Sequence, residues 1–245
     1  MNKKRFRLII SEKNSAKLNM ATDEALALCF EESDLPIFRL YTWEKSFTLG
    51  ISQKITDYEY LEDYNNNCAK RITGGGVLFH GHDLSYSLII PPKYLENLSV
   101  KQSYEKICGF LLEFYKKLGL EAHYVKDDES LKLSKSPFCQ VGFEAYDIVV
   151  NGIKLGGNAQ RRTKKFIFQH GSIPIEKIDE ENKHKSEIGN GLTDFDINIS
   201  YNDAIKLVVE SFEKIFEVQL EASSLKENEK EKLTLLLKDK YDYAK

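Results

Sequence analysis

The period of the apolar residues changes repeatedly along this chain, and these changes limit the folds open to it. Residues 5–11 (RFRLIIS) alternate between apolar and polar side chains, which is the two-residue period of a strand. Residues 15–34 and 99–120 instead repeat their apolar side chains every three or four positions, as an amphipathic helix does. Strand-like runs return at 145–162 and 165–175. Because the two patterns are interleaved without an internal repeat, the sequence predicts an α/β (α+β) fold in which helices pack on a mixed sheet.

Glycine, asparagine and proline mark the ends of several predicted elements. Asn151-Gly152 predicts a two-residue hairpin turn, because both residues tolerate a positive φ. Gly119 is expected to end the helix at 99–120. The strand at 83–90 is expected to end at the two prolines that follow it, since proline cannot donate to a strand ladder.

The last part of the chain has a different composition. Residues 200–218 and 223–245 are charged and helical in pattern, with serine and asparagine where they would cap the helices. Residues 177–200 form the most polar connector of the chain. We therefore expect a main domain at residues 1–178, and a connector with C-terminal helices, packed on that same domain, at residues 179–245.

Charge and hydropathy exclude several classes of protein. The 35 basic and 38 acidic residues leave a formal net charge of −3, whereas nucleic-acid binding normally needs a basic excess. The longest apolar run is too short to cross a membrane, and the first residues lack the apolar core and cleavage site of a signal peptide. The sequence therefore predicts a cytoplasmic protein that binds neither nucleic acid nor membrane.

The four cysteines are scattered, without a C-x-x-C pair or a spacing to histidine that is typical of metal sites. Cys29 and Cys108 lie within apolar helical patterns and are expected to be core thiols. Cys139 lies between a proline and a glycine, in a predicted loop before a strand, so it is the thiol best placed for chemistry. His80 and His82 could suggest a metal, but without a third ligand nearby we expect no metal site.

Three consecutive glycines, Gly74 to Gly76, follow a basic residue pair by two positions. Glycines expose backbone N–H groups and let a ligand approach closely, although a simple turn or bulge would use the same residues. A nucleotide phosphate loop does not fit, because the residue after Gly81 is His82 rather than lysine and the loop precedes a strand instead of a helix. The glycine run alone therefore leaves a ligand site and a turn as open interpretations.

A second polar cluster surrounds Lys154 in a strand-like segment. A lysine in such a segment is usually exposed to solvent, and this remains one interpretation of Lys154. The residues that follow favour another, because Gly156, Gly157 and Asn158 come within four positions of it and His170 lies in the next predicted strand. Small residues beside a lysine let a ligand carbonyl come within hydrogen-bonding distance of the ammonium.

Three separated motifs resemble those of the lipoate-protein ligase, octanoyltransferase and biotin-protein ligase superfamily: KRITGGGVLFHGHDLSYSLI, NGIKLGGNAQRR and FQHGSI. Its opening elements also resemble LNMATDEAL, PIFRLYTW and SFTLGISQ, so the resemblance extends from about residue 15 to residue 175. It implies a mixed, largely antiparallel β-sheet flanked by helices, with a small C-terminal helical segment. It also implies an acyl tunnel between the glycine loop and the strand of Lys154.

Within this superfamily the sequence is most similar to the cysteine-dependent octanoyltransferases. FHGHDLSYS resembles their segment after the glycine loop, and Cys139, Tyr146 and Lys154 follow in the order and at the spacing of that branch. The resemblance implies that Cys139 takes the octanoyl group from octanoyl-acyl-carrier protein as a thioester. A lysine of a lipoyl domain, such as glycine-cleavage H protein, would then accept it. Lys154 is expected to be the ammonium that lowers the pKa of the Cys139 thiol.

The resemblance also implies which residues form the site. The expected catalytic residues are Cys139 and Lys154, and the expected substrate-binding residues are Arg71, Thr73, Gly74, Gly75, Gly76, His80, Gly157, Asn158, Ala159 and His170. Transfer from a thioester to an amide runs downhill, so we expect no cofactor to be required. The enzyme is expected to act as a monomer.

Two alternatives stay open at this point. An ATP-dependent lipoate-protein ligase would form an acyl-adenylate on the same glycine loop, with ATP and Mg²⁺ as cofactors and Lys154 in contact with the adenylate. Gly76 fits this alternative, because that position resembles the ligases. A non-catalytic lipoyl-domain binder, or a lipoyl amidotransferase, would have neither activity.

Overall fold

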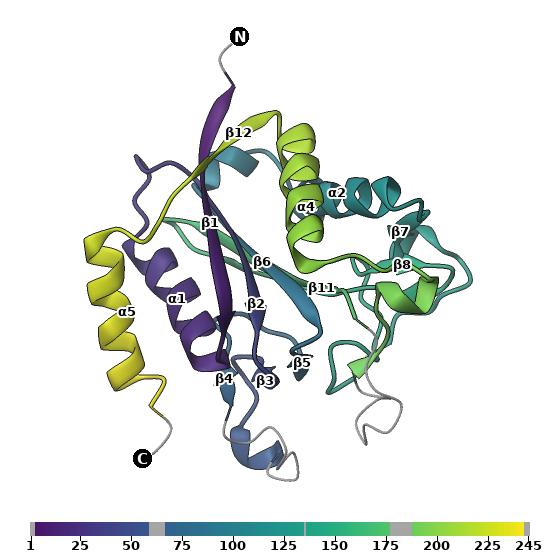
Figure 1. Ribbon diagram of the computed structural model, residues 1–245, viewed down its shortest axis with the longest axis horizontal. Helices are drawn as coiled ribbons and strands as arrows, with labels where there is room; N and C mark the ends of the chain where they lie inside the picture. Colours follow the sequence, from purple (N-terminus) through teal and green to yellow (C-terminus); the bar gives the residue numbers. More distant parts are fainter. Residues whose placement is uncertain (1–2, 59–66, 135, 177–187, 243–245) are drawn as a thin grey trace.

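The computed structural model describes residues 3–58, 67–134, 136–176 and 188–242 (Figure 1). Its central sheet has six strands in the order β10-β11-β6-β2-β1-β12. The strands are β1 (Lys4–Asn14), β2 (Ile37–Trp43), β6 (Asp83–Ile90), β10 (Asn158–Arg162), β11 (Ile167–Pro174) and β12 (Val218–Ala222). The pairs from β10 to β2 are antiparallel, whereas β2, β1 and β12 run parallel to one another. The predicted mixed sheet is confirmed.

Two sheets of three strands extend this framework, in the orders β4-β3-β5 and β7-β8-β9. Their strands are β3 (Ser46–Leu49), β4 (Cys68–Lys70), β5 (Leu78–His80), β7 (Ala122–Tyr124), β8 (Ile148–Val150) and β9 (Ile153–Lys154). The antiparallel pair of β8 and β9 is the hairpin predicted from Asn151-Gly152. Both turn residues have the positive φ that such a turn requires, 51° at Asn151 and 76° at Gly152.

Four α-helices surround the sheets in the described part of the chain: α1 (Ala16–Cys29), α2 (Val100–Lys117), α4 (Tyr201–Phe216) and α5 (Glu227–Asp239). Serine side chains cap the first three, and Ser99 forms a full capping box with Gln102. Gly119 follows α2 with a φ of 80°, as expected for a helix stop. The helix predicted to reach residue 34 ends at Cys29, because Asp34 accepts a hydrogen bond from the Glu31 backbone and closes a turn there.

Neighbouring residues of β2 point to opposite faces of the central sheet, and each face carries its own helices. Phe38 belongs to the cluster covered by α2 and α4, where its ring stacks on Phe212 with centroids 4.0 Å apart. Ile37 belongs to the opposite cluster, with Leu26 of α1. Figure 1 shows α4 beside α2 and α5 beside α1, so the sheet lies between two layers of helices.

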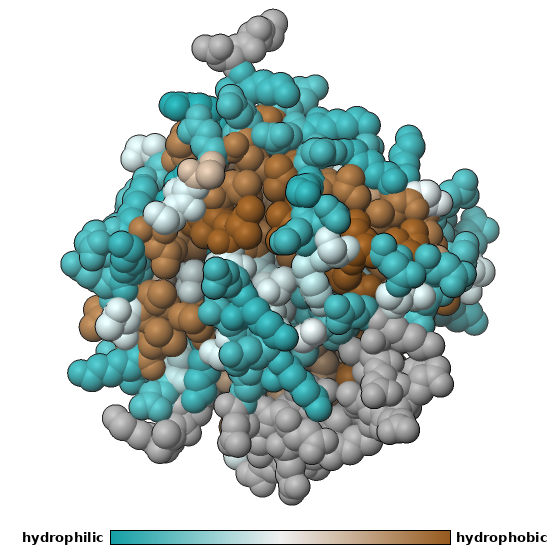
Figure 2. Space-filling view, in the orientation of Figure 1, coloured by the Kyte–Doolittle hydropathy of each residue, from teal (hydrophilic) through white to brown (hydrophobic). Residues whose placement is uncertain are grey.

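The surface of one face reflects this packing. Figure 2 shows apolar side chains gathered over β1 and α4, with polar side chains around them. In this part of the molecule Phe6 of β1 packs edge-on against Phe212 and Phe216 of α4. Among the described residues, no helix combines the length and the apolar character that crossing a bilayer requires.

Strand β12 was not predicted. The sequence predicted continuous helix to residue 218, but α4 ends at Phe216 and Glu217 turns the chain with a left-handed φ of 54°. Residues Val218–Ala222 then pair with Lys4–Leu8. A local pattern cannot reveal this pairing, because the partner strand lies at the other end of the chain. The expected boundary between residues 178 and 179 falls outside the described residues, so that division stays a prediction.

A buried ion pair joins α5 to the sheet. Arg7 of β1 donates from its two terminal nitrogens to both oxygens of Glu229, at 2.6 and 2.9 Å. Arg7 also donates to the Ser224 carbonyl and to the Ser223 hydroxyl. The Arg7 and Glu229 side chains are only 7% and 4% exposed, so the charge of each is compensated mainly by the charge of the other.

We predict that Glu229→Gln lowers the free energy of unfolding by about 3 kcal/mol, because it leaves the Arg7 guanidinium buried without a counter-charge. Equilibrium denaturation in urea would measure the loss. Glu210→Gln is the control, since it breaks the pair with Lys117 at a carboxylate that is 61% exposed, and such a change should cost less than about 1 kcal/mol. Equal losses in the two variants would contradict the prediction.

Candidate active site

A cavity of about 500 Å³ lies where the small sheet β4-β3-β5 meets strands β9, β10 and β11. Its wall includes both residues expected to be catalytic, Cys139 and Lys154. It also includes most of the residues expected to bind substrate: Arg71, Gly74, Gly75, Gly76, His80, Gly157, Asn158, Ala159 and His170. Thr73 lies behind the wall, with its hydroxyl oxygen 2.7 Å from His170 Nε2. The structure therefore brings together residues that the sequence separates widely.

The loop that carries Cys139 (residues 136–142), called the cysteine loop below, packs directly against the glycine run. A Cβ at Gly76 would come within 2.2 Å of the Pro137 carbonyl oxygen, and one at Gly75 would lie 3.3 Å from Cys139 Sγ. Two backbone hydrogen bonds of 2.7 Å, from Val77 N to Pro137 O and from Cys139 N to Val77 O, hold the loops together. The missing side chains thus allow a close approach of two backbones.

The Cys139 thiol faces one cation and one backbone donor. The Gly76 N–H donates to Cys139 Sγ at 3.1 Å, and Arg71 Nη2 lies 3.8 Å from the same sulfur. Arg71 is 5% exposed and is fixed by bonds to Thr48 Oγ1 at 2.8 Å and to the Gly76 carbonyl at 2.5 Å. The guanidinium and the Gly76 N–H are therefore donors placed beside the sulfur.

Lys154 occupies a different place from the one expected. Its ammonium donates to the carbonyl oxygens of Cys139 and Gly142, at 2.5 and 2.8 Å, and pairs with Asp147 at 2.5 Å. Lys154 therefore holds the backbone of the cysteine loop, and the cation beside the sulfur is Arg71. The sequence did not indicate these partners of Lys154. Strand β9 has only two residues, so the direction of the Lys154 side chain depends on which loop packs against the strand.

Asp147 is a site residue that sequence reasoning missed. Its carboxylate is the counter-charge of Lys154, and the two side chains are each 6% exposed. Burial raises the pKa of the Asp147 carboxyl, although the Lys154 ammonium opposes this. The signal that could have found it is the spacing, because Asp147 directly precedes strand β8 and lies two residues before Val149, the partner of Lys154 across the Asn151-Gly152 hairpin.

His80 supports Arg71 from behind. His80 Nε2 lies 2.8 Å from Thr48 Oγ1, which accepts a bond from Arg71 Nη1. The other ring nitrogen of His80, Nδ1, lies 3.0 Å from Asp83 Oδ2. The His80 ring is also stacked on Trp43, with centroids 3.7 Å apart. The chain from Asp83 through His80 and Thr48 therefore fixes the guanidinium that faces the thiol.

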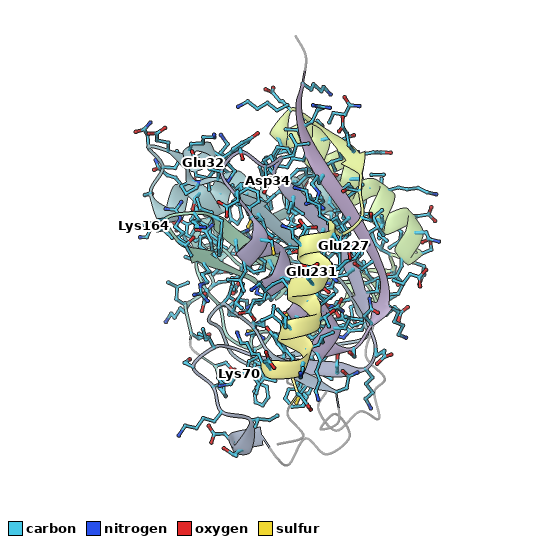
Figure 3. The ribbon with its side chains drawn as sticks, turned by 90° about the vertical axis from the view of Figure 1, so that its left-hand side faces the viewer. Glu32, Asp34, Lys70, Lys164, Glu227 and Glu231 are labelled. Carbon is cyan, nitrogen blue, oxygen red and sulfur yellow. The ribbon has the colours of Figure 1, made fainter. Side chains whose placement is uncertain are left out.

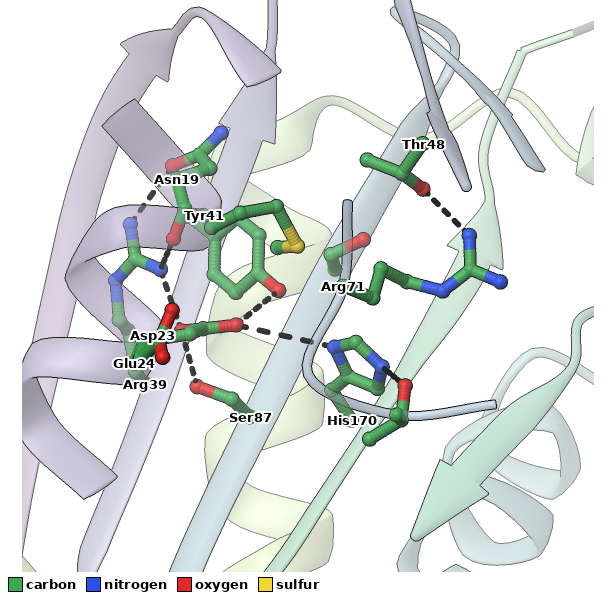
Figure 4. Close-up of polar contacts among 12 residues, drawn as sticks. Asn19, Asp23, Glu24, Arg39, Tyr41, Thr48, Arg71, Ser87 and His170 are labelled. Carbon is green, nitrogen blue, oxygen red and sulfur yellow. Dashed lines mark hydrogen bonds and ion pairs between the residues drawn. The ribbon is translucent and has the colours of Figure 1, made fainter. Parts of the chain in front are cut away.

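A second buried network holds the opposite side of the glycine loop. Figure 4 shows Arg39, Tyr41, Ser87 and His170 converging on Asp23 of α1. Arg39, Tyr41 and Ser87 donate to the Asp23 carboxylate at 2.7, 2.9 and 2.8 Å, and His170 Nδ1 lies 3.8 Å away. Burial alone would raise the pKa of Asp23, but Arg39 and His170 lower it below the ordinary value.

Sequence reasoning also missed Asp23. The helical pattern of residues 15–34 did not single it out, yet Asp23 is 1% exposed. The usable signal was the pair Asn19 and Asp23, which lie four residues apart and therefore share one helix face. Both side chains accept hydrogen bonds from the Arg39 guanidinium, at 2.7 Å each.

His80 and His82, the histidine pair, are both buried. His80 is bonded to Thr48 and Asp83, and burial lowers the pKa of His82. Within the described ranges, no group of three or more histidine, cysteine, aspartate or glutamate side chains is arranged to hold a metal ion.

The buried Asp83 carboxylate gives a testable pH dependence. Burial alone would raise its pKa, but His80, His82 and the Ser172 hydroxyl lower it to about 2. A lowered carboxyl pKa contributes stability that is complete above the unfolded value of 3.8 and is lost as the pH falls toward 2. We predict that the wild type loses about 2 kcal/mol more stability between pH 5 and pH 2 than Asp83→Asn does.

Urea denaturation across this pH range measures the difference. Asp57→Asn, at an exposed aspartate of the short 3₁₀ helix Ile55–Tyr58, is the control and should keep the wild-type profile. Parallel pH profiles for the wild type and Asp83→Asn would contradict the assignment.

Comparison with known proteins gives the family. Residues 15–186 match the family described as lipoyl protein ligase A/B catalytic domain. The octanoyltransferase LipM of Anoxybacillus flavithermus is 33% identical, over 99% of this chain and 97% of the relative. The protein of the same name from Bacillus subtilis is 31% identical, over 98% and 97%.

Solved structures show the same fold at lower identity. A lipoate-protein ligase A bound with ATP superposes with a TM-score of 0.80 at 21% identity, over 97% of this chain and 96% of that one. A putative lipoate protein ligase from T. acidophilum with bound lipoic acid gives 0.79 at 22% identity, over the same shares. The fold and the resemblance read from the sequence motifs are both confirmed, and this chain belongs to the lipoyl protein ligase A/B catalytic domain family.

Proposed function

We propose that this protein is an octanoyltransferase that moves an octanoyl group from acyl-carrier protein to a lysine of a lipoyl domain, through a thioester on Cys139. The observation that carries the proposal is the thiol itself, which lines the cavity with a backbone N–H at 3.1 Å and a guanidinium at 3.8 Å. The two relatives named octanoyltransferase LipM, which match nearly the whole chain, support the same activity.

In the first step, the Cys139 thiolate attacks the thioester carbonyl of the donor. A new carbon–sulfur bond forms, and negative charge develops on the carbonyl oxygen, where the Gly76 N–H and the Arg71 guanidinium are the nearest donors to the sulfur. The oxyanion then collapses and the bond to the carrier sulfur breaks. The carrier leaves as a thiolate and takes up the proton that Cys139 released.

In the second step, the amine of the acceptor lysine attacks the thioester on Cys139. The carbon–nitrogen bond forms, the bond to Cys139 Sγ breaks, and the proton lost by the amine returns to the cysteine. The products are an amide and a free enzyme thiol, so the two steps balance without an oxidant or a nucleotide. The donor thioester supplies the driving force, and this is why the proposal needs neither ATP nor a metal.

Lys154 has a positioning role in this proposal. Its bonds to the Cys139 and Gly142 carbonyls fix the cysteine loop, and its ion pair with Asp147 holds the side chain in place. Holding the nucleophile in one geometry avoids an entropy cost during the reaction. All of these residues fall within the predicted main domain, residues 1–178.

The proposed transfer can be tested at its nucleophile. Cys139→Ser should abolish transfer to a lipoyl domain, because serine lacks the acidity of a thiol and, among the residues that the structure describes, no base is bonded to this side chain. Wild-type protein incubated with octanoyl-acyl-carrier protein should carry a hydroxylamine-sensitive octanoyl adduct on Cys139, detected by mass spectrometry. Cys29→Ser, which changes a half-buried cysteine at the end of α1, should keep full activity.

The same experiment separates the alternatives. If Cys139→Ser retains activity and modification requires free acid with ATP and Mg²⁺, the protein is a lipoate-protein ligase instead. If wild-type protein transfers from neither source but binds a lipoyl domain, it is a binding protein. Glycine-cleavage H protein is a suitable acceptor for all three assays.

A second prediction tests which cation acts on the sulfur. Arg71→Met should slow the alkylation of Cys139 by iodoacetamide at neutral pH by roughly 10-fold or more, because it removes the positive charge that lies 3.8 Å from the reacting sulfur. Arg71→Lys keeps the charge and should recover much of the rate. Peptide mapping by mass spectrometry measures the rate at Cys139 separately from the other cysteines. A rate in Arg71→Met within about twofold of the wild type would exclude Arg71 from this role.

A further inference from the structure

The cavity has an open end and a closed end. Glu144 and Ser134 lie at the open end and are exposed, whereas Tyr41 and Trp43 at the closed end are 1% and 2% exposed. The rings of Tyr41 and Trp43 lie 5.2 Å apart, and Trp43 donates from its indole to Ser85 at 3.0 Å. An alkyl chain that enters from the open end would therefore stop at a wall of aromatic rings.

This wall is backed by residues from the far end of the sequence. Tyr41 and Trp43 share one buried cluster with Ala16 and Met20 of α1 and with Tyr241, which follows α5. Tyr241 is 1% exposed. Leu233, Leu236 and Leu237 of α5 pack against the same cluster. In Figure 3 α5 crosses the front of the molecule, and its labelled glutamates, Glu227 and Glu231, lie on the exposed side.

Polar contacts tie the same segment to α1. The Tyr241 hydroxyl donates to Glu24 Oε2 at 2.8 Å, and the Lys240 ammonium lies 2.7 Å from each Glu24 carboxylate oxygen. Glu24 follows Asp23 directly, so the two carboxylates leave α1 about 100° apart. Asp23 holds Tyr41 and His170 on the sheet side, while Glu24 is held on the α5 side. Side chains of the sheet and of the segment after α5 therefore both bind helix α1 next to the cavity.

We infer that Lys240 and Tyr241 set the length of acyl chain that the cavity accepts. They do so by holding α1, and with it the aromatic wall of Tyr41 and Trp43, in place at the closed end of the cavity, where the tail of the acyl chain would lie. They are positioning residues, because they act through α1 and the aromatic wall and touch no substrate. The inference rests on the proposed function in taking a fatty acyl group as the ligand. Nothing in the charged pattern of the last helix suggested a role at the site.

The test compares acyl chains of different length. Tyr241→Leu removes the ring and the hydroxyl, so the wall can move outward and the closed end becomes deeper. The ratio of kcat/KM for dodecanoyl-acyl-carrier protein to that for octanoyl-acyl-carrier protein should rise roughly 10-fold, since one or a few methylenes in an apolar pocket discriminate by this amount. The change should come mainly from KM, and the alkylation rate of Cys139 should stay within about twofold.

Two further variants separate positioning from stability. Tyr94→Leu is the matched control, because it removes a half-buried tyrosine that packs on Phe6 away from the cavity, and it should leave the ratio unchanged. The double variant Tyr241→Phe with Lys240→Met keeps the ring and the aliphatic stem and removes the bonds to Glu24 and to the Met20 carbonyl, both on α1. Its ratio should rise by about threefold, and it provides the test if Tyr241→Leu does not fold.

An unchanged ratio in folded Tyr241→Leu, or an equal loss of kcat/KM for every chain length, would overturn the inference. Binding of free octanoate and dodecanoate, measured by calorimetry in the same proteins, gives the ratio without any transfer. If this binding ratio shifts while the wild type forms no adduct on Cys139, the inference stands and the proposed transferase is wrong. If the wild type forms the adduct and neither ratio shifts, the transferase stands and the inference is wrong.

Discussion

The contact between the Arg71 guanidinium and the Cys139 thiol is the interaction on which the rest of the site depends. A buried guanidinium needs acceptors for its donors, and Arg71 finds them in Thr48, in the glycine loop carbonyls and in the sulfur. It can reach the sulfur only because the glycine loop has no side chains at the point where the cysteine loop lies on it. The need to compensate the buried charge of Arg71 thus explains three features of the site: the glycines of the loop, the position of Thr48 and the position of Cys139.

Two similar supports hold this arrangement. On one side Asp83, His80 and Thr48 lead to Arg71, and on the other Asp23 and His170 lead to Thr73 in the glycine loop. In both, a buried aspartate orients a histidine that contacts a threonine hydroxyl. The aspartates come from different elements, β6 and α1, so the glycine loop is fixed relative to both the central sheet and the helix. This rigidity suits a pocket in which a nucleophile must meet a carbonyl at one geometry.

Much of the fold could be predicted from the sequence, because its signals are local. The period of apolar residues and the serine caps located α2 and α4, and Asn151-Gly152 located the hairpin of β8 and β9. The motifs located the family, and with it some of the residues that line the cavity. Strand β12 could not be predicted in this way, because its five residues become a strand only by pairing with β1.

The sequence by itself determined most of the larger elements, where several of them end, and which chemical groups are available, namely one loop thiol, one strand lysine and a run of glycines. Only the tertiary structure decided the roles of the charged groups. It set Arg71 rather than Lys154 beside the sulfur, gave Lys154 to Asp147, and packed Tyr241 behind the aromatic wall. The physical reason is that the partner of a buried charge is chosen by which elements pack together, and packing joins residues that no local period connects.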